Sequence, residues 1–336
     1  MFQFILSKLF ALAAIFGFAL IAAANTNANM RVYNGSSAND RYSFVANIES
    51  TDPMYMGKNC TGVLISDNLV LTTANCLMSG GHTWFNPQLM SVFFGKHSYK
   101  VHQALISDKY TQGSFAHNIG LIILASSVPS STAQPVKIYS GKLNAAMDAF
   151  AVGYGITNDK MKYPNSAQVA LMSILDNQKC FKYPQFDSGT EFCASGESNL
   201  CMGDEGAPLL VPNAKDDSVA LAGIASYVVD SNRNAAKVCS NDDEQLVYFE
   251  MCISWAQWIA NVSLVNYSSI VADFSADGTP SGNDDYSQVA SNVDGGAVEG
   301  PLTVINTESG AKRAIHYSDF NSASLIIVFS VLLFFQ

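Results

Sequence analysis

The stretch that decides the fold is the loop Asn199-Leu200-Cys201-Met202-Gly203-Asp204-Glu205-Gly206-Ala207-Pro208-Leu209. Taken alone, its centre is a Gly-Asp-x-Gly turn, and a match that short arises by chance. The loop gains meaning from the rest of the chain, because further short motifs lie upstream of it in a consistent order. The sequence is therefore interpreted outward from this loop.

Three upstream motifs accompany the loop. Leu71-Thr72-Thr73-Ala74-Asn75-Cys76 ends sixteen residues after Cys60, His117-Asn118-Ile119-Gly120-Leu121 opens an apolar run, and Gly153-Tyr154-Gly155-Ile156-Thr157 is a glycine-rich turn. With the loop, these motifs resemble the trypsin/chymotrypsin family of serine proteases. The family's patterns are Leu-Thr-Ala-Ala-His-Cys, Asp-Ile-Ala-Leu-Leu, Gly-Trp-Gly-x-Thr and Cys-x-Gly-Asp-Ser-Gly-Gly-Pro-Leu.

The resemblance also marks where the chain departs from the family's chemistry. The catalytic histidine, aspartate and serine correspond to Asn75, Asn118 and Glu205. An asparagine amide does not titrate near neutral pH, and a carboxylate has no hydroxyl to activate. We therefore expect a pseudoprotease with no working triad. The alternative is an active endopeptidase that uses an unaligned serine and histidine.

The resemblance places the oxyanion hole at the backbone N–H groups of Gly203 and Glu205. We expect the Glu205 carboxylate to fold back and accept hydrogen bonds from these two donors. Unpaired buried donors cost about 1–3 kcal/mol each, and charge-assisted hydrogen bonds are the stronger kind.

The substrate pocket also differs from the family pattern. Its specificity position is Asn199, which carries no charge, and its walls correspond to Ser226-Tyr227-Val228 and to Leu246-Val247-Tyr248. Glycines of the family are replaced by Val228 and Leu246, and both side chains are expected to fill the pocket.

The segment Arg31-Val32-Tyr33-Asn34-Gly35 resembles the family's activation site. Cleavage after Arg31 would free the amino group of Val32, which the resemblance pairs with Asp204. The alternative is an ordinary exposed arginine before a strand.

Short β-rich runs broken by Gly, Pro, Asn and Ser fill the region from Tyr42 to Val262, which predicts an all-β barrel or sandwich. The clearest runs are Val63–Ile65, Leu69–Leu71, Met90–Phe94 and Ile119–Leu124. The stretch Ile253 to Val262 is periodic like an amphipathic helix. The resemblance makes the fold specific: two six-stranded antiparallel β-barrels, trypsin-like, followed by a C-terminal helix.

The seven cysteines indicate an oxidising compartment. The resemblance pairs them as Cys60–Cys76, Cys180–Cys193 and Cys201–Cys239. This leaves Cys252 either as a buried thiol or as half of an intermolecular bridge. Four sequons, at Asn34, Asn59, Asn261 and Asn266, are candidate glycosylation sites.

The chain divides into five segments. Residues 1–24 read as a signal peptide, and residues 25–31 as a short propeptide. Residues 32–262 form the protease-like domain. Residues 263–311 are an acidic Ser/Gly/Asp-rich stalk, expected to be disordered. Residues 312–336 resemble a GPI-attachment signal, with Ser309 as the attachment residue. A transmembrane anchor is the alternative, but the apolar end is shorter than the ~20 residues needed to span a bilayer.

The formal net charge of −10 and the pI near 4.8 argue against a nucleic-acid partner. No metal site or cofactor is expected. The predicted function is binding of a protein partner, a protease or a cell-wall hydrolase, at the extracellular surface. The chain would act as an inhibitor, decoy or adaptor, similar in kind to the glucanase inhibitor proteins of oomycetes. A passive surface or adhesion protein is the remaining alternative.

Overall fold

The computed structural model describes residues 36–38, 40–53, 59–79, 83–111, 115–145, 147–157, 162–181, 186–196, 198, 200–213, 216, 218–230, 245–272, 302–304 and 313–315. The predicted signal peptide and propeptide, Asn34, Asn199, Cys239, Ser309 and nearly all of the predicted stalk and GPI signal lie outside these ranges. The division into five segments therefore stays a prediction.

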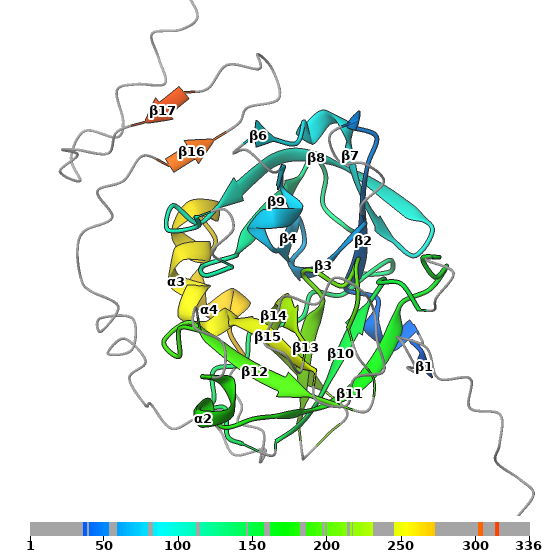
Figure 1. Ribbon diagram of the computed structural model, residues 1–336. Helices are drawn as coiled ribbons and strands as arrows, with labels where there is room; N and C mark the ends of the chain where they lie inside the picture. The colour runs from blue at the N-terminus through cyan, green and yellow to red at the C-terminus, as the bar shows by residue number, and fades with distance from the viewer. Residues whose placement is uncertain are drawn as a thin grey trace, which may run out of the picture. The chain divides into compact units, whose positions relative to one another are not determined.

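The first half of the described region is a closed six-stranded antiparallel barrel in the order β2-β3-β4-β9-β8-β7 (Figure 1). Its strands are β2 (Val45–Ser50), β3 (Cys60–Ser66), β4 (Leu69–Thr72), β7 (Met90–Phe94), β8 (His97–Ile106) and β9 (Gly120–Leu124). Beside them lie the short elements η1 (Asp40–Tyr42), η3 (Ala74–Cys76), β5 (Met78–Ser79), β6 (Thr83–Trp84) and η4 (Pro87–Leu89).

The second half is another antiparallel barrel of six strands, in the order β11-β10-β13-β14-β15-β12, closed where β12 pairs back onto β11. The strands are β10 (Asp148–Gly153), β11 (Gln168–Ile174), β12 (Glu191–Ser195), β13 (Pro208–Pro212), β14 (Val219–Val229) and β15 (Leu246–Met251). Strand β1 (Ser36–Ser37) pairs with the start of β11, whose end pairs with β12, and helix α2 (Asn177–Cys180) precedes β12. The predicted fold, two six-stranded trypsin-like barrels with a C-terminal helix, is confirmed.

Helix α3 (Cys252–Ser263) ends the second barrel and contains the predicted Ile253–Val262 helix. Trp255, Ala256, Ile259 and Ala260 are buried on one face, the spacing of an amphipathic helix. Leu264 ends α3 in the left-handed conformation, with φ of 59°. A single turn, α4 (Tyr267–Ile270), follows, and β16 (Leu302–Val304) pairs with β17 (Arg313–Ile315). None of the helices in the described ranges is both long and apolar enough to cross a membrane.

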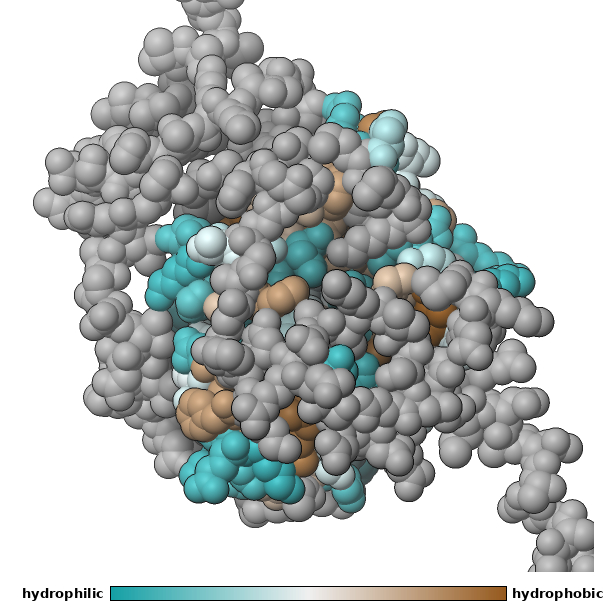
Figure 2. Space-filling model, in the orientation of Figure 1, coloured by the Kyte–Doolittle hydropathy of each residue, from teal (hydrophilic) through white to brown (hydrophobic). Residues whose placement is uncertain are grey.

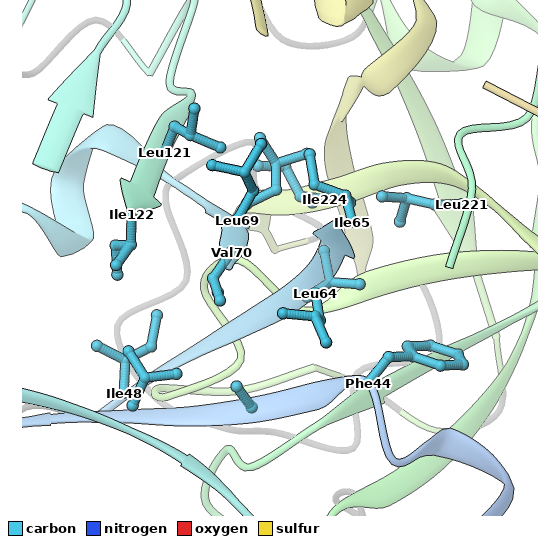
Figure 3. Packing of buried hydrophobic residues seen from close by; sticks show 14 of the residues in the cluster. Phe44, Ile48, Leu64, Ile65, Leu69, Val70, Leu121, Ile122, Leu221 and Ile224 are labelled. Atoms are coloured by element: carbon cyan, nitrogen blue, oxygen red, sulfur yellow. The ribbon is translucent and has the colours of Figure 1, made fainter. Parts of the chain in front are cut away.

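One apolar core joins the two barrels. Leu64 and Ile65 of β3 belong to the same buried cluster as Leu221 and Ile224 of β14, as Figure 3 shows. Each of these four side chains is at most 1% exposed. Complete burial of a side chain of this size contributes about 1.5–3 kcal/mol, so the cluster fixes β3 against β14 and sets the framework on which the site is built.

The disulfide predictions agree with the structure as far as it describes them. Cys60 is bonded to Cys76 and Cys180 to Cys193. Cys201 is also disulfide-bonded, and its predicted partner Cys239 lies outside the described residues. Cys252 is a buried free thiol whose pKa is raised well above its ordinary value, by burial first and by Glu250 second. A disulfide-bonded fold of this kind is typical of extracellular proteins.

The three described sequons differ in accessibility. Asn59 is partly buried next to the disulfide at Cys60, whereas Asn261 and Asn266 are exposed on and after α3. The Asn266 side chain accepts a hydrogen bond from the Ser268 N–H and caps α4.

Candidate functional site

At two positions of the loop before β13, the backbone has a conformation that only glycine adopts readily. Gly203 has φ of 98° and Gly206 has φ of 86°. A Cβ added to Gly206 would lie 2.2 Å from the Thr61 carbonyl oxygen, and one added to Gly203 would lie 2.6 Å from the Tyr163 ring. The loop is therefore held tightly against β3 between two fixed turns.

Asp204 points from this loop into the protein and is almost entirely buried. Its carboxylate accepts hydrogen bonds from the Gly155 N–H (2.7 Å) and the Cys201 N–H (3.0 Å). A Cβ on Gly153 or Gly155 would lie 2.0 or 2.2 Å from the carboxylate oxygens, which explains the two glycines of the Gly153-Tyr154-Gly155 turn. Burial raises the pKa of Asp204 to about 7 despite the two hydrogen bonds that lower it. Its predicted partner Val32 lies outside the described residues.

Glu205 has a different environment from its neighbour. Its side chain is only partly buried, and its Oε2 accepts a hydrogen bond from the Gly203 N–H at 2.8 Å. The predicted fold-back onto the Gly203 donor is confirmed by this contact. The second predicted donor, the N–H of residue 205, stays a prediction. The Glu205 carbonyl oxygen accepts the Thr61 N–H at 2.9 Å, which ties the loop to β3.

The positions of the family's histidine and aspartate lie together. Asn118 is completely buried just before β9, and its Oδ1 accepts the Asn75 backbone N–H at 3.0 Å. Its Nδ2 donates to the Ser226 hydroxyl at 2.9 Å. The Asn75 side chain instead accepts a hydrogen bond from the Thr73 hydroxyl at 2.5 Å. The structure thus joins three predicted site residues, Asn75, Asn118 and Ser226, in one network of uncharged groups.

Glu250 is a member of this site that the sequence motifs did not indicate. It is fully buried on β15, and its carboxylate accepts the Asn118 N–H (2.6 Å) and the Trp255 indole N–H (2.9 Å). Directly across the strand pair lies Glu191 on β12, which is 1% exposed. Burial raises the pKa of both carboxyl groups, to about 7 for Glu191 and well above the ordinary value for Glu250, and their mutual repulsion raises that of Glu250 further.

His117 lies next to Asn118 but outside the strand that follows. It sits in a turn with φ of 55°, and β9 begins three residues later at Gly120. Its ring packs edge-on against Trp255, with centroids 5.8 Å apart, and its Nε2 lies 3.9 Å from an Asp187 oxygen. Burial lowers the pKa of His117 more than Asp187 raises it. These contacts place the ring against α3.

The pocket walls follow the register of β14 and β15. Val228 pairs with Val247, and Leu246 pairs with Val229. Paired residues lie on the same face of a sheet, so Val247 and not Leu246 shares the face of Val228. Leu246 packs in the other cluster, where Tyr227 stacks on Tyr248 with ring centroids 4.6 Å apart. Val228 and Leu246 therefore lie on opposite faces of the strand pair and do not fill one space together, contrary to the expectation.

Known proteins resemble this chain both in sequence and in fold. A family model described as Trypsin matches residues 32–248, which is more than half of the chain. The chain belongs to the trypsin family. Within the described residues, no group of three or more His, Cys, Asp or Glu side chains is arranged to hold a metal ion.

Three relatives illustrate the range of the trypsin family that this chain matches. Kallikrein-9 of Homo sapiens is 28% identical over 218 residues, covering 60% of this chain and 80% of that protein. Glucanase inhibitor protein 1 of Phytophthora sojae is 28% identical over 215 residues, covering 60% and 77%. The solved structure of neuropsin, a serine protease expressed in the limbic system of mouse brain, matches with a TM-score of 0.54 and 23% identity, covering 68% and 98%. This last likeness concerns the fold alone.

Proposed function

We propose that this chain is a catalytically inactive member of the trypsin family that acts outside the cell by binding another protein. The observation that carries the proposal is the hydrogen bond from the Gly203 N–H to the Glu205 carboxylate. This donor is aimed at the place where a trypsin-family enzyme stabilises a developing oxyanion. In this chain the Glu205 carboxylate accepts the hydrogen bond from that donor.

The network around Asn118 supports the same proposal. A serine nucleophile needs a neighbouring base, and a base needs a group that can take up a proton near neutral pH. Asn75 and Asn118 hold each other through amide and backbone hydrogen bonds, and neither side chain titrates in that range. The trypsin-like fold around the site is present, whereas Asn75 and Asn118 stand where the family's enzymes have the histidine and aspartate that serve proton transfer.

The class of partner is proposed from the family context. One trypsin-family relative is named a glucanase inhibitor, and others are named kallikreins. We propose that this chain is an inhibitor, decoy or adaptor whose partner is a protease or a cell-wall hydrolase. The proposed tether is a GPI lipid attached at Ser309, and release of the protein from cells by a phosphatidylinositol-specific phospholipase tests it. A protein that stays on the membrane with residues 325–336 intact would contradict the lipid anchor.

Catalysis is tested on the purified secreted protein with a fluorophosphonate probe and a panel of peptide and ester substrates. We expect neither stoichiometric labelling nor hydrolysis above background. The matched positive control is the triple variant Asn75→His, Asn118→Asp and Glu205→Ser, in which labelling at residue 205 should become detectable. Stoichiometric labelling of any serine in the parent protein would overturn the proposal.

Binding is tested separately, by adding the parent protein to secreted proteases and β-glucanases of the same source and measuring their activity. Saturable inhibition, or a stable complex that leaves activity unchanged, supports an inhibitor or an adaptor respectively. Absence of a complex with every member of both enzyme classes would refute the proposed partner class and favour a passive surface protein.

A further inference from the structure

A second surface feature lies away from the Asn118 and Glu205 site. It is a groove of about 950 Å³ to which both barrels contribute. Its walls come from η1 and the β7–β8 turn of the first barrel, from the connection at 130–137, and from the starts of β11 and β14. Asn75, Asn118, Glu205, Ser226 and Glu250 do not line it, and of the turn around Asp204 only Tyr154 does.

The charge of this groove is opposite to that of the whole chain. The chain carries 28 acidic and 18 basic residues. Yet Arg41, Lys96 and Lys137 all line the groove, and the described lining residues include no aspartate or glutamate. All three cations are exposed to solvent. Cations gathered in a concave surface focus their field and attract anions.

The other lining groups are mostly small and polar. Ser130, Ser131 and Thr132 form one stretch of wall, and further hydroxyl and amide side chains come from Gln134, Asn165, Ser166 and Ser218. Two half-buried tyrosines, Tyr42 and Tyr154, add aromatic rings with a phenol at one end. Hydroxyl and amide groups exchange hydrogen bonds with sugar hydroxyls, and an aromatic face packs against the C–H groups of a sugar ring.

An acidic peptide fits these walls less well than an acidic sugar chain. Peptide ligands are anchored by main-chain pairing to a free strand edge, by apolar side chains in exposed pockets, or, for acidic motifs, by arginine clusters, and Arg41 is the one arginine among the described lining residues. The apolar residues that border the groove give little such surface, because Phe44 is 6% exposed and Phe94 only 2%. The groove is also at the large end of the range for small-molecule sites, about 300–1,000 Å³.

We propose that this groove binds an anionic polysaccharide, with Arg41, Lys96 and Lys137 contacting its carboxylate or sulfate groups and the polar walls contacting its hydroxyls. The inference does not depend on whether the Glu205 site is catalytically active. Exposed ion pairs are individually weak and are screened by salt, so affinity should fall steadily with ionic strength.

The test is a titration of the full secreted chain with four polymers of similar length: polygalacturonate, dextran sulfate, neutral dextran and polyglutamate. We expect the two anionic sugars to bind and the neutral sugar and the acidic peptide to bind weakly or not at all. Equal binding of neutral dextran would show that charge is irrelevant, and equal binding of polyglutamate would assign the groove to acidic peptides. Either result overturns the proposal, as does failure of both anionic sugars to bind.

The residues are tested by a triple variant, Arg41→Gln with Lys96→Gln and Lys137→Gln. Its matched control neutralises three exposed cations outside the groove, Lys109→Gln with Lys142→Gln and Lys179→Gln. Both variants lose the same net charge. We expect the dissociation constant for the anionic sugars to rise roughly tenfold in the groove variant and less than about twofold in the control. Equal losses in the two variants would show that only net charge matters and would refute the site.

Discussion

Two halves of one buried polar network meet at Asn118. The neutral half consists of Asn75, the Asn118 amide and Ser226, and each of its hydrogen bonds joins uncharged groups. The acidic half consists of Glu250 and Glu191, and it begins at the Asn118 backbone N–H. Both halves are shielded from water, but only the second contains ionisable groups.

The difference shows what burial permits. The neutral half is satisfied at any ordinary pH, because none of its side chains titrates there. In the acidic half, Glu191 and Glu250 are both buried and face each other across β12 and β15. Two facing carboxylates cannot both be ionised cheaply in such a place. The acidic half therefore keeps protons to a higher pH than isolated carboxyl groups would.

The surface contrasts with this interior. The face of the molecule shown in Figure 2 has apolar patches separated by polar residues. The large exposed apolar side chains come from separate parts of the chain, such as Leu171 of β11, Phe181 after α2 and Leu264 after α3. The predictions below accordingly address the buried network and the loop beside it.

The largest effect is expected from moving a charge into the neutral half. Asn118→Asp puts a carboxylate next to Ser226 with no cation to compensate it, close to buried Glu250. An uncompensated buried charge costs about 3–5 kcal/mol, and we expect a loss of this order in the free energy of unfolding at pH 8, measured with denaturant. Asn75→His in the same chain should recover part of it below the pKa of the imidazole. Exposed Asn144→Asp is the control and should change stability little; equal effects at the two sites would show that the neutral half tolerates charge.

The second effect is a pH dependence that arises in the acidic half. The pKa of Glu191 is raised in the folded state to about 7, so the folded protein binds more protons than the unfolded chain around neutral pH. Its contribution to stability is complete below the unfolded pKa and is lost as the pH rises through about 7. Glu191→Gln keeps an acceptor for the Asp187 N–H and should flatten the decline between about pH 4.5 and about pH 7, with a gain of about 1–2 kcal/mol at pH 8. Asp204 contributes its own share of the slope, which this variant leaves in place.

The control for the acidic half is Glu49→Gln on β2, an exposed carboxylate whose loss should leave the pH profile unchanged. Thermal unfolding at each pH provides the measurement. If Glu191→Gln and the parent protein decline in parallel between pH 4.5 and pH 7, the burial of the Glu191 carboxyl group does not control the pH dependence.

These two halves also mark how far the sequence predicted the structure. The neutral half and the Glu205 loop lie in short local motifs, so their residues could be identified one by one. The strand runs and α3 follow periodicities that depend on neighbouring residues alone. Glu250 could not be found in this way, because its partners Asn118 and Glu191 are distant in the sequence and become neighbours only through pairing of β15 with β12. A buried glutamate within an apolar strand run was the one available signal.

The expectation that Val228 and Leu246 line one pocket together was wrong for a related reason. The chain between β14 and β15 does not fix the register of β15, and a one-residue slip moves a side chain to the other face of the sheet. Val228 shares its face with Val247 and not with Leu246, which the sequence alone did not indicate. The motif Leu246-Val247-Tyr248 supplied no second marker to anchor the alignment.

The third effect concerns Asp204, a buried carboxylate of the same kind as those in the acidic half. If cleavage after Arg31 frees the Val32 amino group to pair with it, the cation should lower the raised pKa of Asp204. The cleaved protein should then gain about 1 kcal/mol over the uncleaved protein at pH 8 and little at pH 5. Asp204→Asn should abolish this difference. A cleaved protein with the same unfolding temperature as the uncleaved one at both pH values would be incompatible with the ion pair.

The smallest effect is expected at Glu205, where the carboxylate lies at the edge of the buried network. Its Oε2 accepts a hydrogen bond from the Gly203 N–H, and the side chain is only partly buried, so solvent can replace some of what is lost. Glu205→Ala should lower stability by about 1 kcal/mol, the net value of a typical hydrogen bond, while Glu205→Gln keeps an acceptor and should lose less. The measurement is thermal unfolding of the three proteins from pH 4 to pH 8, with Glu49→Ala as the exposed control.

Glu205→Ser should behave like Glu205→Ala in stability and should gain no activity, because Asn75 still provides no base. Should all Glu205 variants unfold with the parent protein at every pH, the contact with Gly203 would contribute nothing, and the case for a self-blocked oxyanion site would fall with it.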